Sequence, residues 1–318
     1  MTTALMILLG LVLLAGGGEM LVRGAVGAAR RFGVSPLLIG LTLVGFGTST
    51  PELVTSLTAA FGGSPGIAVG NVVGSNTANI LFILGLTVLI MPLAVAPAAF
   101  RRDGVVLIGS TLACLLAVLL GQLDRWLGVV FLLLLAGYIV WAFRSERAHP
   151  DAEAAKHEHV AEDAPKGPPS IWMSVGLALV GIGVTIAGAR VLVEAAVDLA
   201  RGFGVSDTVV GLTIVAVGTS LPELVACVVA ALRRHADVAL GNIVGSNIYN
   251  VLGILGVTAV VKPIPVPVEI ARFDIWVLLA ATALLALFLR TGWTLKRWEG
   301  GAFLLLYGGY VAWLVVNA

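Results

Sequence analysis

Two short stretches of the chain place a carboxylate just after a helix-breaking proline, inside otherwise apolar sequence. They are GFGTSTPELVTS at residues 45–56 and AVGTSLPELVAC at residues 216–227. Proline lacks an N–H group and clashes with the preceding turn, so each stretch predicts a broken helix. The break frees backbone carbonyl groups beside Glu52 and Glu223, and such groups are tolerated in a membrane where they line a cavity or bind an ion. The two stretches therefore predict a cation site.

The stretch that follows each break adds amide and hydroxyl oxygens. These side chains are four residues apart and so share one helix face. They are Asn71, Ser75 and Asn79 in the first half of the chain and Asn242, Ser246 and Asn250 in the second. Hydrogen bonds that join helices explain Asn71 and Asn242 as well as ion binding does. For Asn79 and Asn250 we favour the ion site.

The donor set is that of a hard cation. It contains carboxylate, hydroxyl, amide and carbonyl oxygens, with no thiol, imidazole, Lys or Arg. All four histidines, at positions 149, 157, 159 and 235, lie in predicted loops. Oxygen ligands disfavour zinc, copper and iron, and flexible coordination by carboxylates and carbonyls suits Ca²⁺ better than Mg²⁺. Sodium, which is similar in size to calcium, is the natural competitor.

The composition indicates an all-α integral membrane protein. Of the 318 residues, 59% are hydrophobic and 12% are charged, whereas a soluble domain carries about 25% charged residues. Several apolar runs exceed the roughly 20 residues that span a bilayer as a helix. We predict ten transmembrane helices, near residues 3–24, 35–61, 66–91, 102–121, 125–143, 171–192, 206–232, 238–261, 271–289 and 297–316.

The two halves of the chain repeat each other. A shift of 171 residues aligns 32–89 with 203–260, and 30 of these 58 positions are identical. Each half has five predicted spans, so the second half enters the membrane inverted, which is a common plan of secondary transporters with a midplane site. We predict a first repeat at 1–143, a linker at 144–170 and a second repeat at 171–318. The alternative is a duplicated bundle with no transport role.

The distribution of Lys and Arg predicts the orientation. Most of these residues in the predicted loops fall on the side of the 144–170 linker, and loops rich in Lys and Arg stay in the cytoplasm. We therefore expect a cytoplasmic-membrane protein with both termini outside and the linker inside. His157, Glu158 and His159 in the linker offer metal ligands, but mixed charge and prolines favour a solvated, flexible segment.

The repeated blocks GTSTPEL … GNVVGSNTAN and GTSLPEL … GNIVGSNIYN resemble the calcium/cation antiporter superfamily, and within it the prokaryotic sodium/calcium exchangers. They look like its two α-repeats, here near 40–85 and 211–256. The resemblance implies that Glu52 and Glu223 are central carboxylates shared by Ca²⁺ and Na⁺, with Asn79 and Asn250 completing the middle. It also implies further ligands around them, namely hydroxyls and carbonyls of Thr48 and Thr219, Na⁺-binding Ser49, Ser75, Ser220 and Ser246, and carbonyls of Gly45 and Ala216.

These features predict a secondary active transporter rather than an enzyme, with no cofactor. We expect exchange of about three Na⁺ for one Ca²⁺ by alternating access, with Ca²⁺ extruded and the first and sixth spans moving as a gate. Some relatives, notably potassium-dependent exchangers, carry Asp where this chain has Asn250, which argues against potassium dependence. The expected partners are Ca²⁺, Na⁺ and the lipid bilayer, and no nucleic acid. The alternatives are a proton-coupled divalent-cation antiporter, a passive cation channel and, as the weakest, an intramembrane enzyme.

Overall fold

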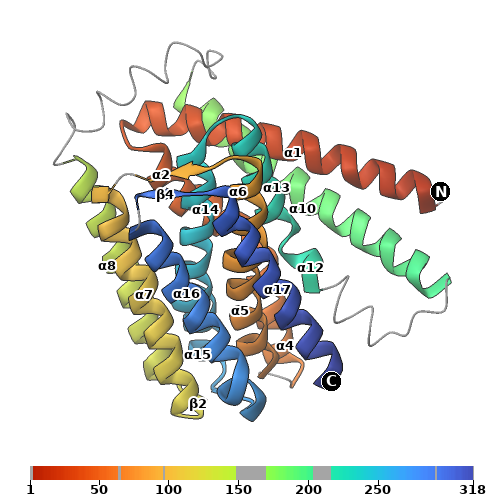
Figure 1. Cartoon of the computed structure of the whole chain (residues 1–318), viewed down its shortest axis with the longest axis vertical. Helices are drawn as coiled ribbons and strands as arrows, with labels where there is room; N and C mark the ends of the chain where they lie inside the picture. The colour runs from red at the N-terminus through yellow and green to blue at the C-terminus, as the bar shows by residue number, and fades with distance from the viewer. Residues whose placement is uncertain are drawn as a thin grey trace.

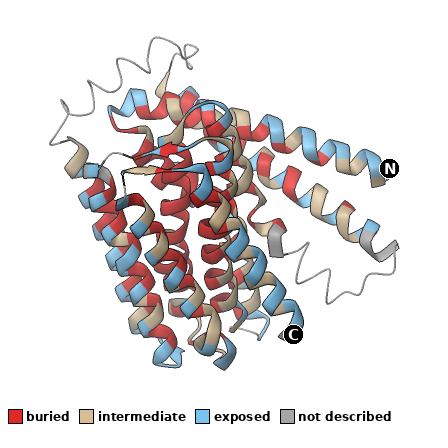
Figure 2. Ribbon diagram, in the orientation of Figure 1, coloured by how far each residue is buried: buried red, intermediate tan, exposed pale blue. Residues whose placement is uncertain are grey.

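The computed structural model describes residues 3–63, 66–95, 97–147, 170–202, 216–290 and 292–317. Almost all of them are helical, and the helices form a bundle that is crossed on one side by two long helices, α1 and α10 (Figure 1). Buried residues run through the middle of the bundle, and exposed residues lie on its outer faces and helix ends (Figure 2).

The first half comprises α1 (Thr3–Phe32), α2 (Pro36–Ile39), η1 (Gly40–Val44), α3 (Gly45–Thr48), α4 (Thr50–Phe61), α5 (Gly66–Ala78), η2 (Asn79–Leu84), α6 (Gly85–Ile90), β1 (Leu93–Ala94), α7 (Pro97–Leu119), β2 (Gln122–Leu123) and α8 (Arg125–Arg147). The second half comprises α10 (Ile171–Gly202), α12 (Ala216–Thr219), α13 (Leu221–Leu232), α14 (Ala236–Tyr249), η4 (Asn250–Leu255), α15 (Gly256–Val261), β3 (Ile264–Pro265), η5 (Ile270–Asp274), α16 (Ile275–Arg290), β4 (Thr294–Leu295) and α17 (Arg297–Asn317). Segments labelled η are π-helical turns.

The described helices agree with a membrane-spanning bundle. Eight are long and apolar enough to cross a bilayer, and a ninth span is formed by Pro36–Thr48 and Thr50–Phe61, which meet at a bend of 42°. The predicted span 206–232 falls partly on residues 203–215, which lie outside the described residues, so the count of ten stays a prediction. Most of the predicted linker 144–170, with its His157, Glu158 and His159, also lies outside them, since the description stops at Arg147 and resumes at residue 170. The predicted start of the linker at 144 is wrong, because residues 144–147 still belong to helix α8.

Four helices extend beyond the predicted bounds of their spans: α7 begins at Pro97 instead of 102, α8 ends at Arg147 instead of 143, and α1 and α10 extend furthest. The spans predicted at 3–24 and 171–192 are parts of α1 and α10, which run on to Phe32 and Gly202. The predicted ends of these two spans were set by the length of the apolar run alone. A helix continues past that run as long as its backbone hydrogen bonds are made and one of its faces is buried. In α1 that face is made by Ala25, Ala28 and Ala29, which are fully buried although polar residues follow them.

Contacts across the repeat show how the halves fit together. Thr111 Oγ1 on α7 lies 3.3 Å from Thr282 Oγ1 on α16, and these two residues are 171 positions apart. The short strands also pair between halves, β1 with β4 and β2 with β3, both antiparallel. Residues related by the repeat thus meet at a pseudo-two-fold axis, as an inverted repeat requires. The domain boundary at 171 stays a prediction.

The two long helices pack on each other through small residues. A Cβ atom added to Gly24 of α1 would lie 2.4 Å from the backbone nitrogen of Ala178, and one added to Gly181 of α10 would lie 2.4 Å from that of Leu21. Backbones this close require glycine. The glycines of these helices therefore join α1 to α10 as one unit, and the proposed gating movement of that unit stays a prediction.

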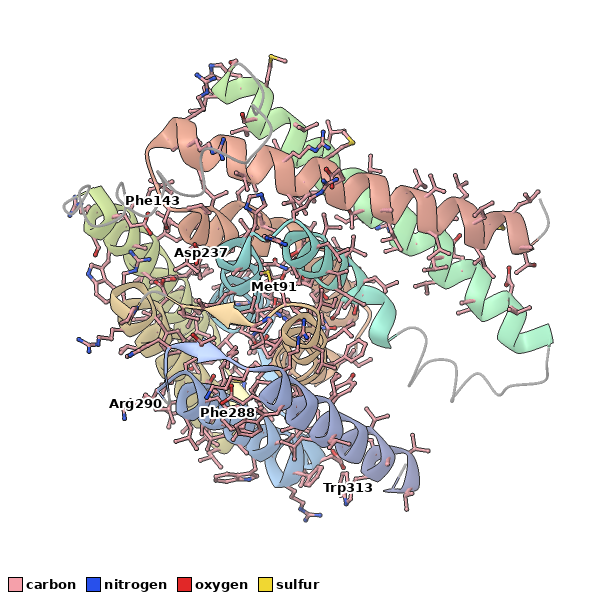
Figure 3. All side chains as sticks on the ribbon, turned by 45° about the horizontal axis from the view of Figure 1, so that its top comes forward. Met91, Phe143, Asp237, Phe288, Arg290 and Trp313 are labelled. Carbon is pink, nitrogen blue, oxygen red and sulfur yellow. The ribbon has the colours of Figure 1, made fainter. Side chains whose placement is uncertain are left out.

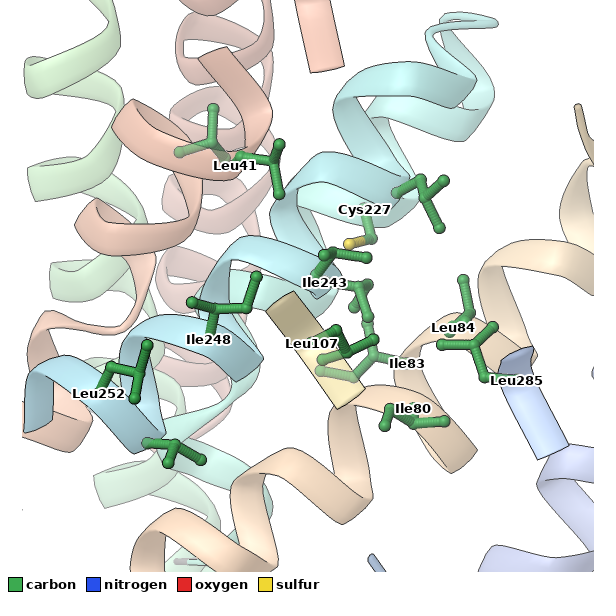
Figure 4. Close-up of a cluster of buried hydrophobic side chains, with 14 of the residues drawn as sticks. Leu41, Ile80, Ile83, Leu84, Leu107, Cys227, Ile243, Ile248, Leu252 and Leu285 are labelled. Carbon is green, nitrogen blue, oxygen red and sulfur yellow. The ribbon is translucent and has the colours of Figure 1, made fainter. Parts of the chain in front are cut away.

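Helix α14 lies at the centre of the bundle. The apolar window of the span that it opens is 83% buried, and its Ile243 and Ile248 belong to a buried cluster with Leu41 of η1 (Figure 4). A Cβ atom added to Gly245 would lie 2.1 Å from the carbonyl oxygen of Leu41. Gly245 is therefore one of the points where α14 of the second half meets η1 of the first, as Gly241 is.

We expect Gly245→Ala to lower the thermal unfolding temperature of the purified protein strongly. The added methyl group meets backbone, which cannot move aside as a side chain can, and overpacking of a core costs about 1–3 kcal/mol or more. Gly137→Ala is the matched control, because Gly137 is exposed on α8 with no atom within 4 Å of the added Cβ. The measurement is thermal unfolding in detergent. Equal melting of both variants and wild type would contradict the close contact.

Candidate cation site

Both predicted helix breaks are present, and each falls at a serine. Ser49 (φ −80°, ψ 9°) separates α3 from α4, and Ser220 (φ −91°, ψ 9°) separates α12 from α13. Pro51 and Pro222 lie in the first turn of the helix after the break, where the missing N–H group costs no intrahelical bond. The breaks thus come two residues before the prolines.

The two carboxylates lie at the starts of the helices that follow the breaks. Glu52 is in the first turn of α4 and Glu223 is in the first turn of α13, and each is only 1% exposed. A helix N-terminus carries partial positive charge and favours an anion there. Among the described residues, no Lys or Arg forms an ion pair with either carboxylate. Two buried acidic groups without a cationic side chain are typical of a cation site.

Reciprocal hydrogen bonds bring the two breaks together. Ser49 Oγ donates to Glu223 Oε1 at 2.8 Å, and Ser220 Oγ donates to Glu52 Oε1 at 3.3 Å. Each serine therefore holds the carboxylate of the opposite repeat. The other carboxylate oxygens, Glu52 Oε2 and Glu223 Oε2, are buried and accept no hydrogen bond within the described part of the chain.

Two asparagines supply further acceptors at matching positions. Asn79 opens the π-helical turn η2, and Asn250 opens η4, which are repeat-related turns of a kind common at functional sites. The Oδ1 atoms of both are buried without a hydrogen-bond donor in the described structure. Asn250 Nδ2 donates to Asn76 Oδ1 at 2.9 Å, which fixes the orientation of the amide and leaves Asn250 Oδ1 without a donor in the described structure.

The sequence analysis missed Asn76 and Asn247. Asn76 accepts from Asn250 and donates through Nδ2 to the carbonyl oxygen of Asn247 at 3.0 Å, so it bridges the repeats. Asn247 donates to Ile243 O at 2.7 Å, and its Oδ1 has no recorded partner among the described residues. Neither residue lies on the stripe defined by spacing of four. The signal was their presence in both copies of GSN-x-x-N inside an apolar span.

Asn71 and Asn242 act as structural links, one of the two roles left open by the sequence. Asn71 Nδ2 donates to the carbonyl oxygen of Glu52 at 3.1 Å and to Ser56 Oγ at 3.0 Å. Asn242 Nδ2 donates to the carbonyl oxygen of Glu223 at 3.3 Å and to the repeat-related Cys227 Sγ at 3.2 Å. Each amide therefore fixes the backbone that carries a central carboxylate.

The other predicted residues of the first break lie close to this core. Thr48 Oγ1 donates to Asn242 Oδ1 at 3.1 Å. The carbonyl oxygen of Gly45 accepts from Ser246 Oγ at 3.1 Å and from Ser49 N at 3.2 Å. The first break is thus bonded to α14 of the opposite repeat.

The remaining predicted residues are Ser75 in the first half and Thr219 and Ala216 in the second. Ser75 is buried on α5. Thr219 is half-buried at the end of α12, where it lines a cavity of about 220 Å³ together with Pro51 and Pro222. Ala216 is the first residue of α12, and the residues before it lie outside the described part of the chain. Both breaks border the cavity.

The arrangement is suited to a hard cation. Five oxygens from Glu52, Glu223, Asn79, Asn247 and Asn250 are buried and have no donor among the described residues, although buried acceptors are normally satisfied. No group of three or more His, Cys, Asp or Glu occurs in the described regions. Carboxylate and amide oxygens in a flexible array are ligands for Ca²⁺ or an ion of similar size.

An inverted helical repeat with buried oxygen ligands at its centre defines a membrane ion transporter. A family model described as "Sodium/calcium exchanger protein" matches residues 2–144 and 173–316. The chain therefore belongs to the sodium/calcium exchanger family, which confirms the resemblance of the α-repeats.

Relatives of the chain match it along nearly its whole length. It is 40% identical to a protein named as a proposed antiporter, CaxA of Alkalimonas amylolytica, over 98% of each chain. It is 33% identical to the sodium/calcium exchanger MaX1 of Methanosarcina acetivorans, over 98% of this chain and 97% of that protein. A solved structure of the sodium–calcium exchanger NCX_Mj, soaked with zero Na⁺ and Ca²⁺, superposes with a TM-score of 0.83 at 33% identity, covering 98% of each chain.

Proposed function

We propose that the chain exchanges Na⁺ for Ca²⁺ across the cytoplasmic membrane, in the manner of a secondary antiporter. The observation that carries the proposal is the pair of buried carboxylates, each hydrogen-bonded by the serine of the opposite repeat, with one oxygen of each left unbonded. Two negative charges neutralise one Ca²⁺, so this ion is bound without a net charge in the membrane. Family membership and the solved NCX_Mj structures soaked with Na⁺ and Ca²⁺ support the choice of ions.

We assign residue roles as the family resemblance implies, and the hydrogen bonds around the two breaks support the assignment. Glu52 and Glu223 bind Ca²⁺ and also compete for Na⁺, and Asn79 and Asn250 contribute their Oδ1 atoms. The serines Ser49, Ser75, Ser220 and Ser246 bind Na⁺ at outer positions. Thr48 and Thr219 contribute carbonyls and hydroxyls, and Gly45 and Ala216 contribute carbonyls. Ions of either kind need the same central carboxylates, so binding of one excludes the other, and this competition couples their fluxes.

Alternating access requires a unit that moves relative to the site. We assign this role to the joined pair α1 and α10, which packs against the broken helices. In the present conformation Glu19 of α1 accepts a hydrogen bond from Arg233 Nε, at the end of α13, at 2.8 Å. This ion pair connects the mobile unit to the site-bearing helix, and it has to separate when α1 moves along α13.

The test is ⁴⁵Ca²⁺ uptake into proteoliposomes loaded with Na⁺. We expect uptake that needs an outward Na⁺ gradient and disappears when Na⁺ is replaced by K⁺ or choline. A pH gradient without Na⁺ should drive no uptake. Uptake that follows the pH gradient and ignores Na⁺ would contradict the proposal and indicate a proton-coupled antiporter. Ion conductance far above the turnover of a carrier would indicate a channel.

A further inference from the structure

A groove between α7 and α16 lies outside the cation site. Its volume is about 510 Å³. Its floor includes Thr111 and Thr282, each 2% exposed and within 3.3 Å of each other. Its walls carry exposed apolar side chains, including Val105 and Leu287. The groove therefore faces the hydrocarbon of the bilayer along two spanning helices.

Two arginines stand at one end of this groove. Arg101 lies in the first turns of α7 and Arg290 is the last residue of α16, and both are exposed. Arg290 lies at the edge of the bundle (Figure 3). No acidic residue is among the groove's described lining residues. The positive charge at this end thus has no counter-charge within the groove.

Among the described residues, the neighbouring Arg102, unlike Arg101, is paired with carboxylates inside the protein. Its guanidinium donates to both carboxylate oxygens of Asp103, at 2.7 and 2.9 Å, and to Glu146 Oε1 at 3.3 Å. Arg101, by contrast, lies over the ring of Trp293, with Cζ 5.8 Å from its centre. Trp293 lines the groove as well. The end of the groove formed by Arg101, Arg290 and Trp293, called the mouth below, thus combines two guanidinium groups with an aromatic ring.

The repeat does not reproduce this mouth at the other end of the two helices. Arg101 corresponds to Arg272, but Arg290 corresponds to Leu119 under the shift of 171. The turn that carries Trp293, GWTLKRW at 292–298, is one residue longer than its counterpart, GQLDRW at 121–126. The basic and aromatic mouth is thus a feature of the second turn alone.

The backbone at Trp293 is also unusual. Its φ is 56°, a value that bulky residues rarely adopt. Strained residues persist where the surroundings fix them, often at ligand sites. In this conformation the indole ring lies beneath Arg101, and tryptophan is enriched at membrane interfaces.

The mouth lies at the end of the molecule that carries the linker. Arg102 donates to Ala142 O and Glu146 near the C-terminus of α8, and α8 leads into the linker. The Lys and Arg distribution places this end in the cytoplasm. Anionic lipids populate that leaflet, and basic pockets between spanning helices on that side bind their headgroups.

We infer that this groove binds an anionic phospholipid of the cytoplasmic leaflet, with its phosphate at Arg101 and Arg290 and an acyl chain along the apolar walls. A soluble phosphate would use the arginines but leave the apolar groove unused. The acidic residues within the linker's mixed charge would likewise match the arginines but not the apolar walls. A phospholipid matches both parts, and Trp293 lies at the boundary between them.

The experiment is native mass spectrometry of the purified protein equilibrated with equal amounts of phosphatidylglycerol and phosphatidylcholine. Wild type should retain phosphatidylglycerol preferentially. R101Q/R290Q should retain at least fivefold less, whereas R101K/R290K should stay within about twofold of wild type. R272Q/R125Q is the matched control, because it removes two exposed arginines near the opposite ends of spanning helices. Equal retention by R101Q/R290Q and this control would overturn the inference.

A second variant tests the acyl-chain part. Ala283 lines the groove and is exposed, so Ala283→Trp fills the groove without entering the core. We expect at least a threefold loss of phosphatidylglycerol with both arginines intact, and a smaller rise in unfolding temperature when this lipid is added. Undiminished binding in Ala283→Trp, together with displacement by free glycerol phosphate, would indicate an anion site without an acyl chain and would overturn the inference.

Discussion

Glu52→Gln is expected to abolish Na⁺-driven Ca²⁺ uptake. The substitution removes one of the two charges that we propose neutralise Ca²⁺, from a position that is 1% exposed and has no cationic side-chain partner in the described structure. Removal of one partner from a buried ionic arrangement costs about 3–5 kcal/mol, and each 1.4 kcal/mol is about tenfold in affinity. Ca²⁺ affinity should therefore fall by more than about 100-fold, and Glu223→Gln should behave alike because the repeat makes the two residues equivalent.

The same variant should change stability in the opposite direction. Without ions, the wild-type protein holds two carboxylates close together in a buried site, and a neutral amide relieves their repulsion. We expect Glu52→Gln to raise the unfolding temperature in ion-free buffer and to lose the further rise that Ca²⁺ gives wild type. A variant that merely misfolds would melt earlier under both conditions, so the sign of the shift separates loss of binding from loss of structure.

Glu269→Gln is the control for this experiment. Glu269 is exposed immediately before η5, away from the broken helices. Its replacement should leave both uptake and the Ca²⁺-induced stabilisation unchanged. Retention of wild-type uptake and Ca²⁺ affinity by Glu52→Gln would exclude Glu52 from the site and with it the proposed coordination.

Much of this site could be predicted because its motifs occur twice in the sequence. Broken helices, a carboxylate after each break and an asparagine one span later recur at a constant shift of 171 residues. A single copy of such a motif inside an apolar run could be a structural kink. Two copies whose identical positions are polar predict a site shared by both repeats. In an inverted repeat the two copies face each other, so each binds the other, as the hydrogen bond from Ser49 to Glu223 does.

Other features depend on pairings between halves that spacing within one helix does not determine. Asn76 bridges to Asn247 and Asn250, and its role follows only once α5 and α14 are placed side by side. The same holds for Gly245, whose close neighbour is Leu41 of the other half. The bounds of the first and sixth spans, 3–24 and 171–192, were too short, because the sequence does not show how the alanines and glycines at the ends of α1 and α10 pack.

Ca²⁺ transport is expected to respond strongly to membrane voltage. The central site carries about two negative charges, so one bound Ca²⁺ leaves it neutral, whereas three Na⁺ bound at the central and outer positions leave one positive charge. On the expected stoichiometry of three Na⁺ for one Ca²⁺, each cycle moves one net charge across the membrane. One elementary charge moved through 100 mV is worth about 2.3 kcal/mol, which corresponds to about a 40-fold change in the Ca²⁺ concentration ratio at equilibrium.

The measurement uses proteoliposomes with equal Na⁺ on both sides and a K⁺ gradient. Uptake of one Ca²⁺ against release of three Na⁺ moves one positive charge outward, so valinomycin with high external K⁺, which makes the interior positive, should drive Ca²⁺ inward. Reversal of the K⁺ gradient should drive it outward. The control replaces all Na⁺ by choline and should abolish the response, since without Na⁺ no charge is coupled to Ca²⁺. If Ca²⁺ flux persisted but ignored the K⁺ potential, exchange would be electroneutral, and the outer hydroxyl positions would not hold a third Na⁺.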